Sequence, residues 1–320
     1  MISVIIATHN RARLLATTLE ALAGQESPGR PFEIVVVDNA SVDETPAVVQ
    51  EAAGRTAVPI VYLREDRAGK SHAMNTAIAH ARGDLLVLTD DDVLPCAGWL
   101  AAYAAAFDET GADYAVGRIL PLWEAAPPTW LSPKLYGVLA IPDGGTTKLP
   151  LGKRINDQIM PLGANMAVRR HVVDRIGGWN PSLGKLQGTL RTGEDHEFAL
   201  RMTDAGFVGV YEPAAYVHHR VPADRLRLAY FHRWFYDNGI VHSGLDQQYP
   251  PTDRYLLKVP RYLWRQLVKD VMLMAGGIVR LDAGRAVAGE MRLAWFAGYI
   301  RGCWDRWRAG EGPRLKTSES

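Results

Sequence analysis

Short apolar runs alternate with longer amphipathic stretches in the first third of the chain. The runs are rich in Val, Ile and Leu, whereas the stretches between them repeat apolar positions every three or four residues. This alternation predicts an α/β fold in which a mostly parallel sheet is flanked by helices. The predicted strands are Ile2–Ala7, Glu33–Asp38, Ile60–Leu63 and Leu85–Thr89.

Polar residues gather where three of these predicted strands end. In open α/β sheets, ligands bind beyond the carboxyl ends of the strands. The pattern therefore predicts one polar site built from three strand ends. Its residues are Thr8, His9 and Asn10, then Asp38 and Asn39, and finally Asp90, Asp91 and Asp92.

The pattern changes further along the chain. Residues 121–163 are rich in Pro and Gly and form a longer stretch than an ordinary connection, which is typical of a lid or a binding loop. A strand at 164–168, a helix at 194–205 and strands at 208–211 and 216–219 would complete a first domain of residues 1–223. Long helical patterns then cover residues 224–310, and residues 311–320 are predicted to be a flexible tail.

Composition limits the class of protein. The chain has 320 residues, 48% of them hydrophobic, so it can bury a substantial core. Its net charge of +1 carries no signature of a nucleic-acid partner, and the apolar run at 271–279 is far shorter than the roughly 20 residues of a membrane helix. Two cysteines and no signal-peptide pattern favour a cytoplasmic protein.

Three consecutive carboxylates, Asp90, Asp91 and Asp92, follow the fourth predicted strand. Like charges so close together repel one another unless a cation or hydrogen-bond donors compensate them. Hard divalent cations such as Mg²⁺ and Mn²⁺ favour oxygen ligands, so the triplet indicates a metal site. The residues also leave open a solvated acidic turn at the start of the next helix.

A second polar run follows the strand that ends at Asp38. Asp38 could accept hydrogen bonds from a base or a ribose. Ser41 or Asp43 could instead cap the helix that follows.

An acidic pair, Glu194 and Asp195, opens the predicted helix at 194–205. The helix dipole favours an ionised Asp195 that can take up a proton, although acidic residues are also ordinary at a helix start. Glu197 and Arg201, one turn apart, are predicted to form a surface ion pair.

Six segments in a fixed order carry a further signal: "SVIIATHNRARLL", "EIVVVDNASVDET", "GKSHAMNTAIAHARGDLLVLTDDDV", "GANMAVRR", "GGWNPSLG" and "TGEDHEFALRMTDAG". Together they resemble the successive motifs of family 2 glycosyltransferases with a GT-A fold, over about residues 2–222. Each segment alone is weakly specific. Their combination is specific, because a nucleotide-binding strand, an acidic metal triplet and a Glu-Asp helix start rarely coincide.

The resemblance implies a role for each matching residue. Asp195 would be the catalytic base, and a divalent metal would be held by Asp92 directly, with Asp90 nearby. His219 would complete that site, with its neighbour His218 as the competing candidate. The donor side would comprise Thr8, Asn10, Asp38, Lys70, Asp90 and Asp91. The acceptor side would comprise Gly163, Asn165, Trp179 and Glu194.

Two features depart from the family pattern. Many relatives carry Arg where Met74 precedes Asn75, so Lys70, alone or with the metal, would meet the charge of the donor diphosphate. The "QxxRW" pattern of processive polymer synthases is not evident, although Arg233-Trp234 offers a fragment. One sugar is therefore expected to be transferred per encounter.

The C-terminal region has its own charge pattern. Residues 254–308 contain eleven Lys or Arg against four Asp or Glu, a local net charge of +7. On a helical projection Leu256, Val259, Leu263, Leu267, Val271 and Met274 share one face, opposite Lys258, Arg261, Arg265 and Lys269. This amphipathic pattern and its aromatic residues favour an anionic membrane surface as partner. Packing on the catalytic domain or on a second copy of the chain stays open.

The sequence therefore predicts an inverting glycosyltransferase at the inner face of the cell membrane. It would move one sugar from a nucleotide diphosphate sugar to a hydroxyl of a saccharide or lipid-linked acceptor, in cell-envelope polysaccharide or glycolipid synthesis. A sugar nucleotidyltransferase would need a Gly-rich phosphate loop, which "ATHNRAR" does not provide. A catalytically silent nucleotide-binding or membrane scaffold is disfavoured by the acidic triplet and by the Glu194-Asp195 pair.

Overall fold

The computed structural model describes residues 1–152, 159–184, 190–252 and 254–310. The chain folds into two compact units. The first, the sheet unit, comprises residues 1–122, 140–184 and 194–220. The second, the helical unit, contains residues 221–310 together with two short earlier segments, 123–139 and 190–193. The predicted flexible tail at 311–320 lies outside the described residues.

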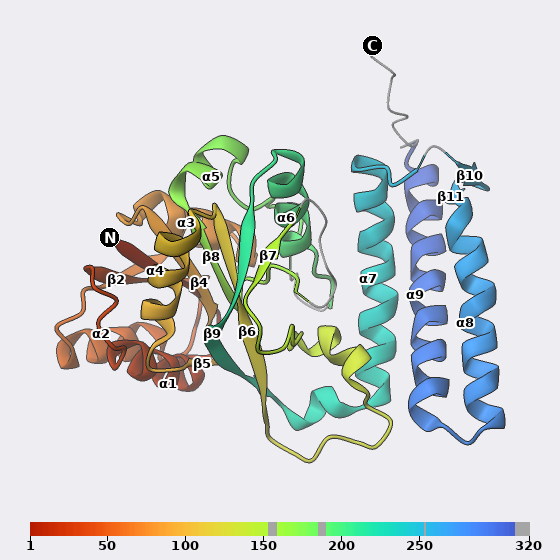
Figure 1. Cartoon of the computed structure of the whole chain (residues 1–320), viewed down its shortest axis with the longest axis horizontal. Coiled ribbons are helices and arrows are strands. Elements are labelled where there is room, and N and C mark those ends of the chain that lie inside the picture. The colour runs from red at the N-terminus through yellow and green to blue at the C-terminus, as the bar shows by residue number, and fades with distance from the viewer. Residues whose placement is uncertain (153–158, 185–189, 253, 311–320) are drawn as a thin grey trace, which may run out of the picture. The chain divides into compact units, whose positions relative to one another are not determined.

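Four parallel strands form one half of the sheet in the sheet unit, in the order β3-β2-β1-β4 (Figure 1). These strands coincide with the four that the sequence predicts. Most of their side chains are Val, Ile or Leu, and those of β1, β2 and β4 are largely buried, which is typical of parallel strands covered by helices on both sides. Their bounds are β1 (Ile2–Thr8), β2 (Phe32–Asp38), β3 (Ile60–Arg64) and β4 (Leu85–Asp90).

The other half of the sheet contains antiparallel pairs, namely β8 with β4 and β6, and β9 with β5 and β7, so the sheet as a whole is mixed. It continues from β4 through β8, β6 and β9 to β5, and β7 also pairs with β9. These strands are β5 (Val93–Pro95), β6 (Tyr114–Trp123), β7 (Leu149–Leu151), β8 (Asn165–Arg169) and β9 (Gly209–Val221).

One continuous strand, β9, replaces the two strands predicted at 208–211 and 216–219. Pro213 lies in the gap between the two predicted runs, and proline cannot donate a hydrogen bond to a neighbouring strand. In the structure Pro213 lies between the stretch of β9 that pairs with β7 and the stretch that pairs with β5. The strand therefore accommodates proline without losing either pairing.

Helices α1 to α6 belong to the sheet unit. Helix α1 buries Ala12, Leu15, Leu19 and Leu22, the three- and four-residue spacing of an amphipathic helix. A single core joins β1, β2, β4, β6 and β8 to buried side chains of α3, α5 and α6. The helices are α1 (Ala12–Ala23), α2 (Thr45–Arg55), α3 (Lys70–His80), α4 (Trp99–Thr110), α5 (Arg170–Ile176) and α6 (Glu194–Asp204).

The helical unit is built on three long helices, α7 (Leu228–Gln248), α8 (Arg261–Val279) and α9 (Ala283–Arg308). Helix α9 packs against both α7 and α8 and runs between them (Figure 1). The unit also contains two short 3-10 helices, Pro133–Leu139 and Ala223–Leu226. Among the described residues, no helix combines the length and hydrophobicity needed to cross a membrane.

Helix α8 starts later than the amphipathic pattern predicts. Leu256 and Val259 belong to a short hairpin whose two strands, β10 (Tyr255–Leu256) and β11 (Val259–Pro260), have two residues each. The helix begins only at Arg261. The reason is Pro260, which disfavours helical backbone at the residue before it. Val259 and Leu263 pack in a core with Tyr299 of α9, so part of the predicted apolar face lies inside the unit.

Glycines allow α7 and α9 to approach closely. A Cβ added at Gly298 would lie 2.0 Å from the carbonyl oxygen of Tyr236, and one added at Gly239 would lie 2.1 Å from that of Trp295. Because both obstacles are backbone atoms, neither can move aside without separating the helices. Gly276 of α8 differs, since its nearest neighbour is the Arg285 side chain at 3.9 Å.

We expect Gly298→Ala to lower the free energy of unfolding by about 2 kcal/mol or more, because the added methyl overpacks the α7–α9 contact. The matched control Gly276→Ala should be neutral or raise it by up to about 1 kcal/mol, since alanine is the better helix former. Urea denaturation monitored by tryptophan fluorescence measures both. Equal effects of the two substitutions would show that the helices are not in close contact.

Candidate active site at the carboxyl ends of the parallel strands

Three adjacent parallel strands bring the predicted polar residues to one edge of the sheet. Thr8 at the end of β1 is in register with Asp38 at the end of β2, and Ala7 is in register with Asp90 at the end of β4. The site predicted from these strand ends is therefore assembled by sheet pairing alone.

Arginine and threonine side chains compensate the acidic triplet. One terminal nitrogen of Arg11 donates to Asp91 at 2.8 Å and to Asp92 at 2.9 Å. The Thr8 hydroxyl donates to the other oxygen of Asp91 at 2.8 Å. Burial raises the pKa of Asp91 even though the nearby Arg11 charge opposes this shift. Asp91 is thus an internal partner of Thr8 and Arg11.

Arg11 is the residue that sequence reasoning missed. It follows the first strand in "THNRAR", where no role was assigned to it. The signal was the triplet itself, because three adjacent carboxylates require nearby positive charge. Thr18 of α1 holds the backbone of the triplet in place, because its hydroxyl donates to the carbonyl oxygens of Asp91 and Val93.

Asp92 lies beside His219 of β9. The Nε2 atom of His219 lies 3.4 Å from Asp92 Oδ1, and both side chains are buried. His219 pairs with Val93 across β5 and β9, whereas His218 points to the other face of the strand, where its ring contacts Tyr216. Of the two candidate histidines, the structure brings His219 to the acidic triplet.

The Asp92–His219 pair suits a divalent cation in its chemistry. Carboxylate oxygen suits Mn²⁺, and neutral imidazole nitrogen is a common metal ligand. The nitrogen of His219 next to Asp92 is Nε2, and the other ring nitrogen, Nδ1, is buried with no hydrogen-bond partner among the described residues. Asp90 has a different partner, because Lys70 Nζ donates to one of its oxygens at 2.6 Å. Within the ranges that the structure describes, no three His, Cys, Asp or Glu side chains converge on one point.

Asp38 is fully buried at the end of β2. One of its oxygens accepts the Ser41 N–H at 2.7 Å, and the other accepts the Tyr62 hydroxyl at 2.7 Å, with Arg64 3.5 Å away. Burial and the bond to Asp38 raise the pKa of Tyr62. Asp38 therefore shapes the loop beyond β2 in this structure.

Asn10 has a left-handed backbone, with φ of 52°, and is exposed beside this loop. Its side-chain oxygen accepts the Val42 N–H, and its backbone N–H donates to Ser41 Oγ. Asp43 accepts the N–H groups of Ala12 and Thr45, which are the first residues of α1 and α2. Ser41 and Asp43 thus fix the loop and the two helix starts.

Lys70, the first residue of α3, lies among carboxylates. Burial disfavours its charge, but Asp90, Asp195 and Glu194 outweigh this and hold the pKa of Lys70 above its usual value. Gly163 lies against the same group, since a Cβ there would be 3.2 Å from Asp195 and 3.4 Å from Lys70 Nζ. The structure thus brings Lys70, Asp90, Gly163 and Asp195 together.

Two N–H groups orient Asp195 at the start of α6. The Gly163 backbone N–H donates to Oδ2 at 2.8 Å, and the Trp179 indole donates to Oδ1 at 3.1 Å. The Trp179 ring is buried and stacks on Phe198 at 4.0 Å. The two donors fix the orientation of the carboxylate, and Asp195 remains partly exposed.

Glu194 differs from its neighbour. It is buried, and its Oε2 atom has no hydrogen-bond partner among the described residues. Burial, reinforced by the Asp195 charge and opposed by Lys70, raises the pKa of Glu194 to about 7. Glu194 is therefore expected to be partly protonated near neutral pH.

Comparison with known proteins identifies the family of this chain. A family model described as glycosyl transferase family 2 matches residues 3–176, more than half of the chain. The chain belongs to glycosyl transferase family 2.

Curated relatives support the assignment. Glycosyltransferase AglE of Haloferax volcanii is 25% identical over 214 residues, which cover 64% of this chain and 62% of AglE. Succinoglycan biosynthesis protein ExoM of Rhizobium meliloti is 27% identical over 242 residues, which cover 75% of this chain and 73% of ExoM. The chain thus matches about three fifths of the length of AglE.

Solved structures show the same fold. The mannosyltransferase PcManGT of Pyrobaculum calidifontis, in complex with GDP-Man and Mn²⁺, superposes with a TM-score of 0.65 at 20% identity. That match covers 95% of this chain and 87% of PcManGT. Residues 1–349 of S. aureus TarS superpose with a TM-score of 0.51 at 18% identity, covering 98% of this chain and 93% of the other. The GT-A fold expected from the sequence motifs is confirmed.

Asn165, expected on the acceptor side of this family 2 site, belongs to the core instead. Its side chain is fully buried and accepts hydrogen bonds from Trp99 and Tyr103. Its amide nitrogen donates to the carbonyl oxygens of Arg118 and Ala215. All four hydrogen-bonding positions are occupied, so none is left for an acceptor.

The Glu197–Arg201 pair is buried rather than on the surface. Two hydrogen bonds of 2.8 Å join the guanidinium to the carboxylate, and Glu197 is almost completely buried. Arg201 also donates to the carbonyl oxygens of residues 176–178. It therefore anchors the loop that precedes Trp179. Met74, where many family members carry Arg, lies in the hydrophobic core.

We expect Glu194→Gln to stabilise the protein only at higher pH. The pKa of the Glu194 carboxyl rises from 4.5 to about 7 on folding, so its ionisation lowers the free energy of unfolding as the pH increases from about 4.5 to 7. Above pH 7 the amide should raise the free energy of unfolding by on the order of 2–3 kcal/mol, and below about pH 4.5 the difference should vanish. Denaturation at pH 4.5 and pH 8 measures the two limits.

The matched control for this effect is Glu20→Gln on the exposed side of α1. It should show no such pH dependence. An effect of Glu194→Gln that is equal at both pH values would mean that the Glu194 carboxyl titrates normally.

Proposed function

We propose that this protein transfers a sugar from a nucleotide diphosphate sugar to an acceptor hydroxyl with inversion at the anomeric carbon. The observation that carries the proposal is the position of Asp195. It is an oriented carboxylate at the start of α6, beside Lys70 and the acidic triplet at the strand ends. A proton acceptor therefore lies next to the groups that would bind the diphosphate.

In the proposed reaction the acceptor oxygen attacks the anomeric carbon while the bond to the diphosphate oxygen breaks. Asp195 takes the proton of the attacking hydroxyl, and the nucleoside diphosphate leaves with the bonding electron pair. Trp179 and Gly163 hold the carboxylate in place, so the base needs no reorientation before it acts. Lys70 lies where it can balance charge on the diphosphate.

Charge at the strand ends supports a divalent cation in the proposed site. Arg11 pairs with Asp91 and Asp92, and Lys70 pairs with Asp90, so two basic side chains face three aspartates, with Glu194 and Asp195 close to Lys70. A divalent cation would offset part of this excess of carboxylates. Asp92 and His219 would hold it, and it would stabilise the negative charge of the leaving diphosphate.

Relatives suggest the class of donor and acceptor. PcManGT was solved with GDP-Man and Mn²⁺, and TarS with UDP-GlcNAc, so both structural relatives bind nucleotide diphosphate sugars. ExoM is a succinoglycan biosynthesis protein, and TarS is a poly(ribitol-phosphate) β-N-acetylglucosaminyltransferase. We therefore infer a saccharide acceptor of the cell envelope for this chain, polymeric or lipid-linked.

We expect Asp195→Asn to lower turnover by about a hundredfold or more while donor affinity changes little, because an amide cannot take up the acceptor proton. Trp179→Phe keeps the carboxylate and the stacking on Phe198 but removes one of its two donors, so a smaller loss of about tenfold is expected. Steady-state release of nucleoside diphosphate measures turnover, and calorimetry measures donor binding.

Asp204→Asn at the exposed end of the same helix is the control and should keep full turnover. Wild-type turnover of Asp195→Asn with a bound donor would remove Asp195 from the mechanism.

A further inference from the structure

The hairpin that precedes α8 exposes apolar side chains at its tip. Leu256 is 52% exposed and Leu257 is 79% exposed. Trp304 and Trp307, in the last turns of α9, are about half exposed. With Lys258 and Arg308, these residues form a surface that we call the hairpin tip: Leu256, Leu257, Lys258, Trp304, Trp307 and Arg308.

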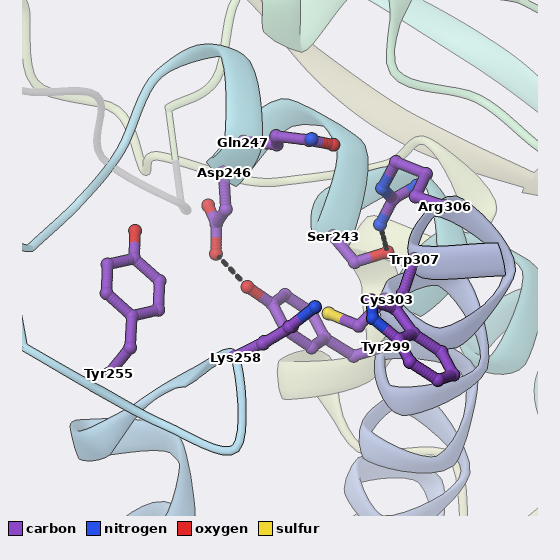
Figure 2. Close-up of a pocket in the computed structure, with 9 residues that line it drawn as sticks. All are labelled: Ser243, Asp246, Gln247, Tyr255, Lys258, Tyr299, Cys303, Arg306 and Trp307. Carbon is purple, nitrogen blue, oxygen red and sulfur yellow. Dashed lines mark hydrogen bonds between the residues drawn. The ribbon is translucent and has the colours of Figure 1, made fainter. Parts of the chain in front are cut away.

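Direct contacts join the hairpin to the end of α9. The Lys258 ammonium lies 5.1 Å from the centre of the Trp307 ring, and the Trp307 and Trp304 rings are 5.1 Å apart. The Arg308 guanidinium lies 5.2 Å from the Trp304 ring. Figure 2 shows Lys258 of the hairpin lining the same pocket as Trp307 of α9. The hairpin tip is thus one continuous surface within the helical unit.

The turn itself is unusual in its residues. Leu257 and Lys258 are its two central residues, with φ of 51° and 63°. A two-residue hairpin turn with positive φ at both positions normally carries Asn-Gly, because branched or long side chains disfavour that backbone. Here a leucine and a lysine are held in the disfavoured conformation and project into solvent. Local folding preference does not explain these residues.

Positive charge surrounds the apolar side chains. Lys258, Arg261, Arg265 and Arg308 are all exposed, and none forms a salt bridge with a carboxylate of the described residues. They belong to the segment 254–308, which carries a net charge of +7. The combination of exposed leucine, two tryptophans and uncompensated basic residues matches the chemistry of an anionic lipid interface.

We propose that the hairpin tip binds the surface of an anionic phospholipid bilayer, with Leu257 and the two tryptophans entering the headgroup region. Six residues are too few for a stable protein interface, which typically uses about 20–30 residues on each side. A lipid interface requires no matching partner surface, so a few apolar side chains and several charges suffice for reversible attachment. The proposal does not depend on the identity of the donor or the acceptor.

The test uses the full chain and the double variant Leu257→Asn/Lys258→Gly. This variant gives the turn its preferred residues, so it should unfold at a higher denaturant concentration than the wild type. It should also bind vesicles of phosphatidylglycerol and phosphatidylcholine about tenfold more weakly, because one leucine and one charge leave the interface. Co-sedimentation with vesicles at low salt measures the partition coefficient, and added salt, at about 0.5 M NaCl, should weaken wild-type binding.

Leu281→Asp provides a matched control. Leu281 is 93% exposed and, like Leu257, has a positive φ. It lies in the connection between α8 and α9, so the whole length of α8 separates it from the hairpin. It should bind vesicles as the wild type does. Three results would overturn the proposal. These are unchanged binding of the double variant, equal loss in Leu281→Asp, and a wild type that ignores anionic vesicles but forms a dimer that the double variant disrupts.

Discussion

Repulsion among carboxylates at one edge of the sheet is the constraint on which the rest of the site depends. The register of β1, β2 and β4 places Asp38 and the acidic triplet at the same end of three adjacent strands. The fold therefore creates a concentration of negative charge before any ligand binds. Arg11 and Lys70 offset that charge from two helix starts, one after β1 and one after β3. The positions of Arg11 and Lys70 therefore determine which carboxylate oxygen atoms remain available to bind a cation or a ligand.

A second set of buried contacts holds the proposed base in place. The stacking of Trp179 on Phe198 fixes the indole that donates to Asp195, and the buried Glu197–Arg201 pair anchors the loop before Trp179. These residues come from α6 itself and from the segment that follows α5. Asp195 is consequently oriented by the packing of its own helix, and small changes in that packing would be felt at the reactive carboxylate.

The sequence was sufficient for the parallel half of the fold and for the location of the site. Alternating β-branched runs define β1 to β4, and their polar ends identify the site edge, because both patterns are local. The other half was harder to predict, since the two separate runs at 208–211 and 216–219 belong to one strand, β9, whose two ends pair with different partners. Pro260 was an available signal for the late start of α8 that the apolar periodicity obscured.

Residue roles that depend on distant contacts could not be deduced from the sequence alone. Asn165 stands in a motif segment, yet its four hydrogen bonds come from α4, β6 and β9. Arg11 lies 80 residues from Asp91, so the acidic triplet signals a need for positive charge but no local pattern indicates which residue supplies it. The choice between His218 and His219 likewise depended on strand alternation across β5 and β9.

The most direct test measures Mn²⁺ binding to the wild type, to Asp92→Asn and to Arg11→Gln. Electron paramagnetic resonance monitors binding through the decrease in the signal of free Mn²⁺. If a divalent cation offsets the excess of carboxylates at the strand ends, the wild type should bind one Mn²⁺, and Asp92→Asn should bind it at least about tenfold more weakly. Arg11→Gln should bind Mn²⁺ more tightly than the wild type, because a competing positive charge has been removed from Asp92. Unchanged binding by Asp92→Asn, or weaker binding by Arg11→Gln, would contradict the account.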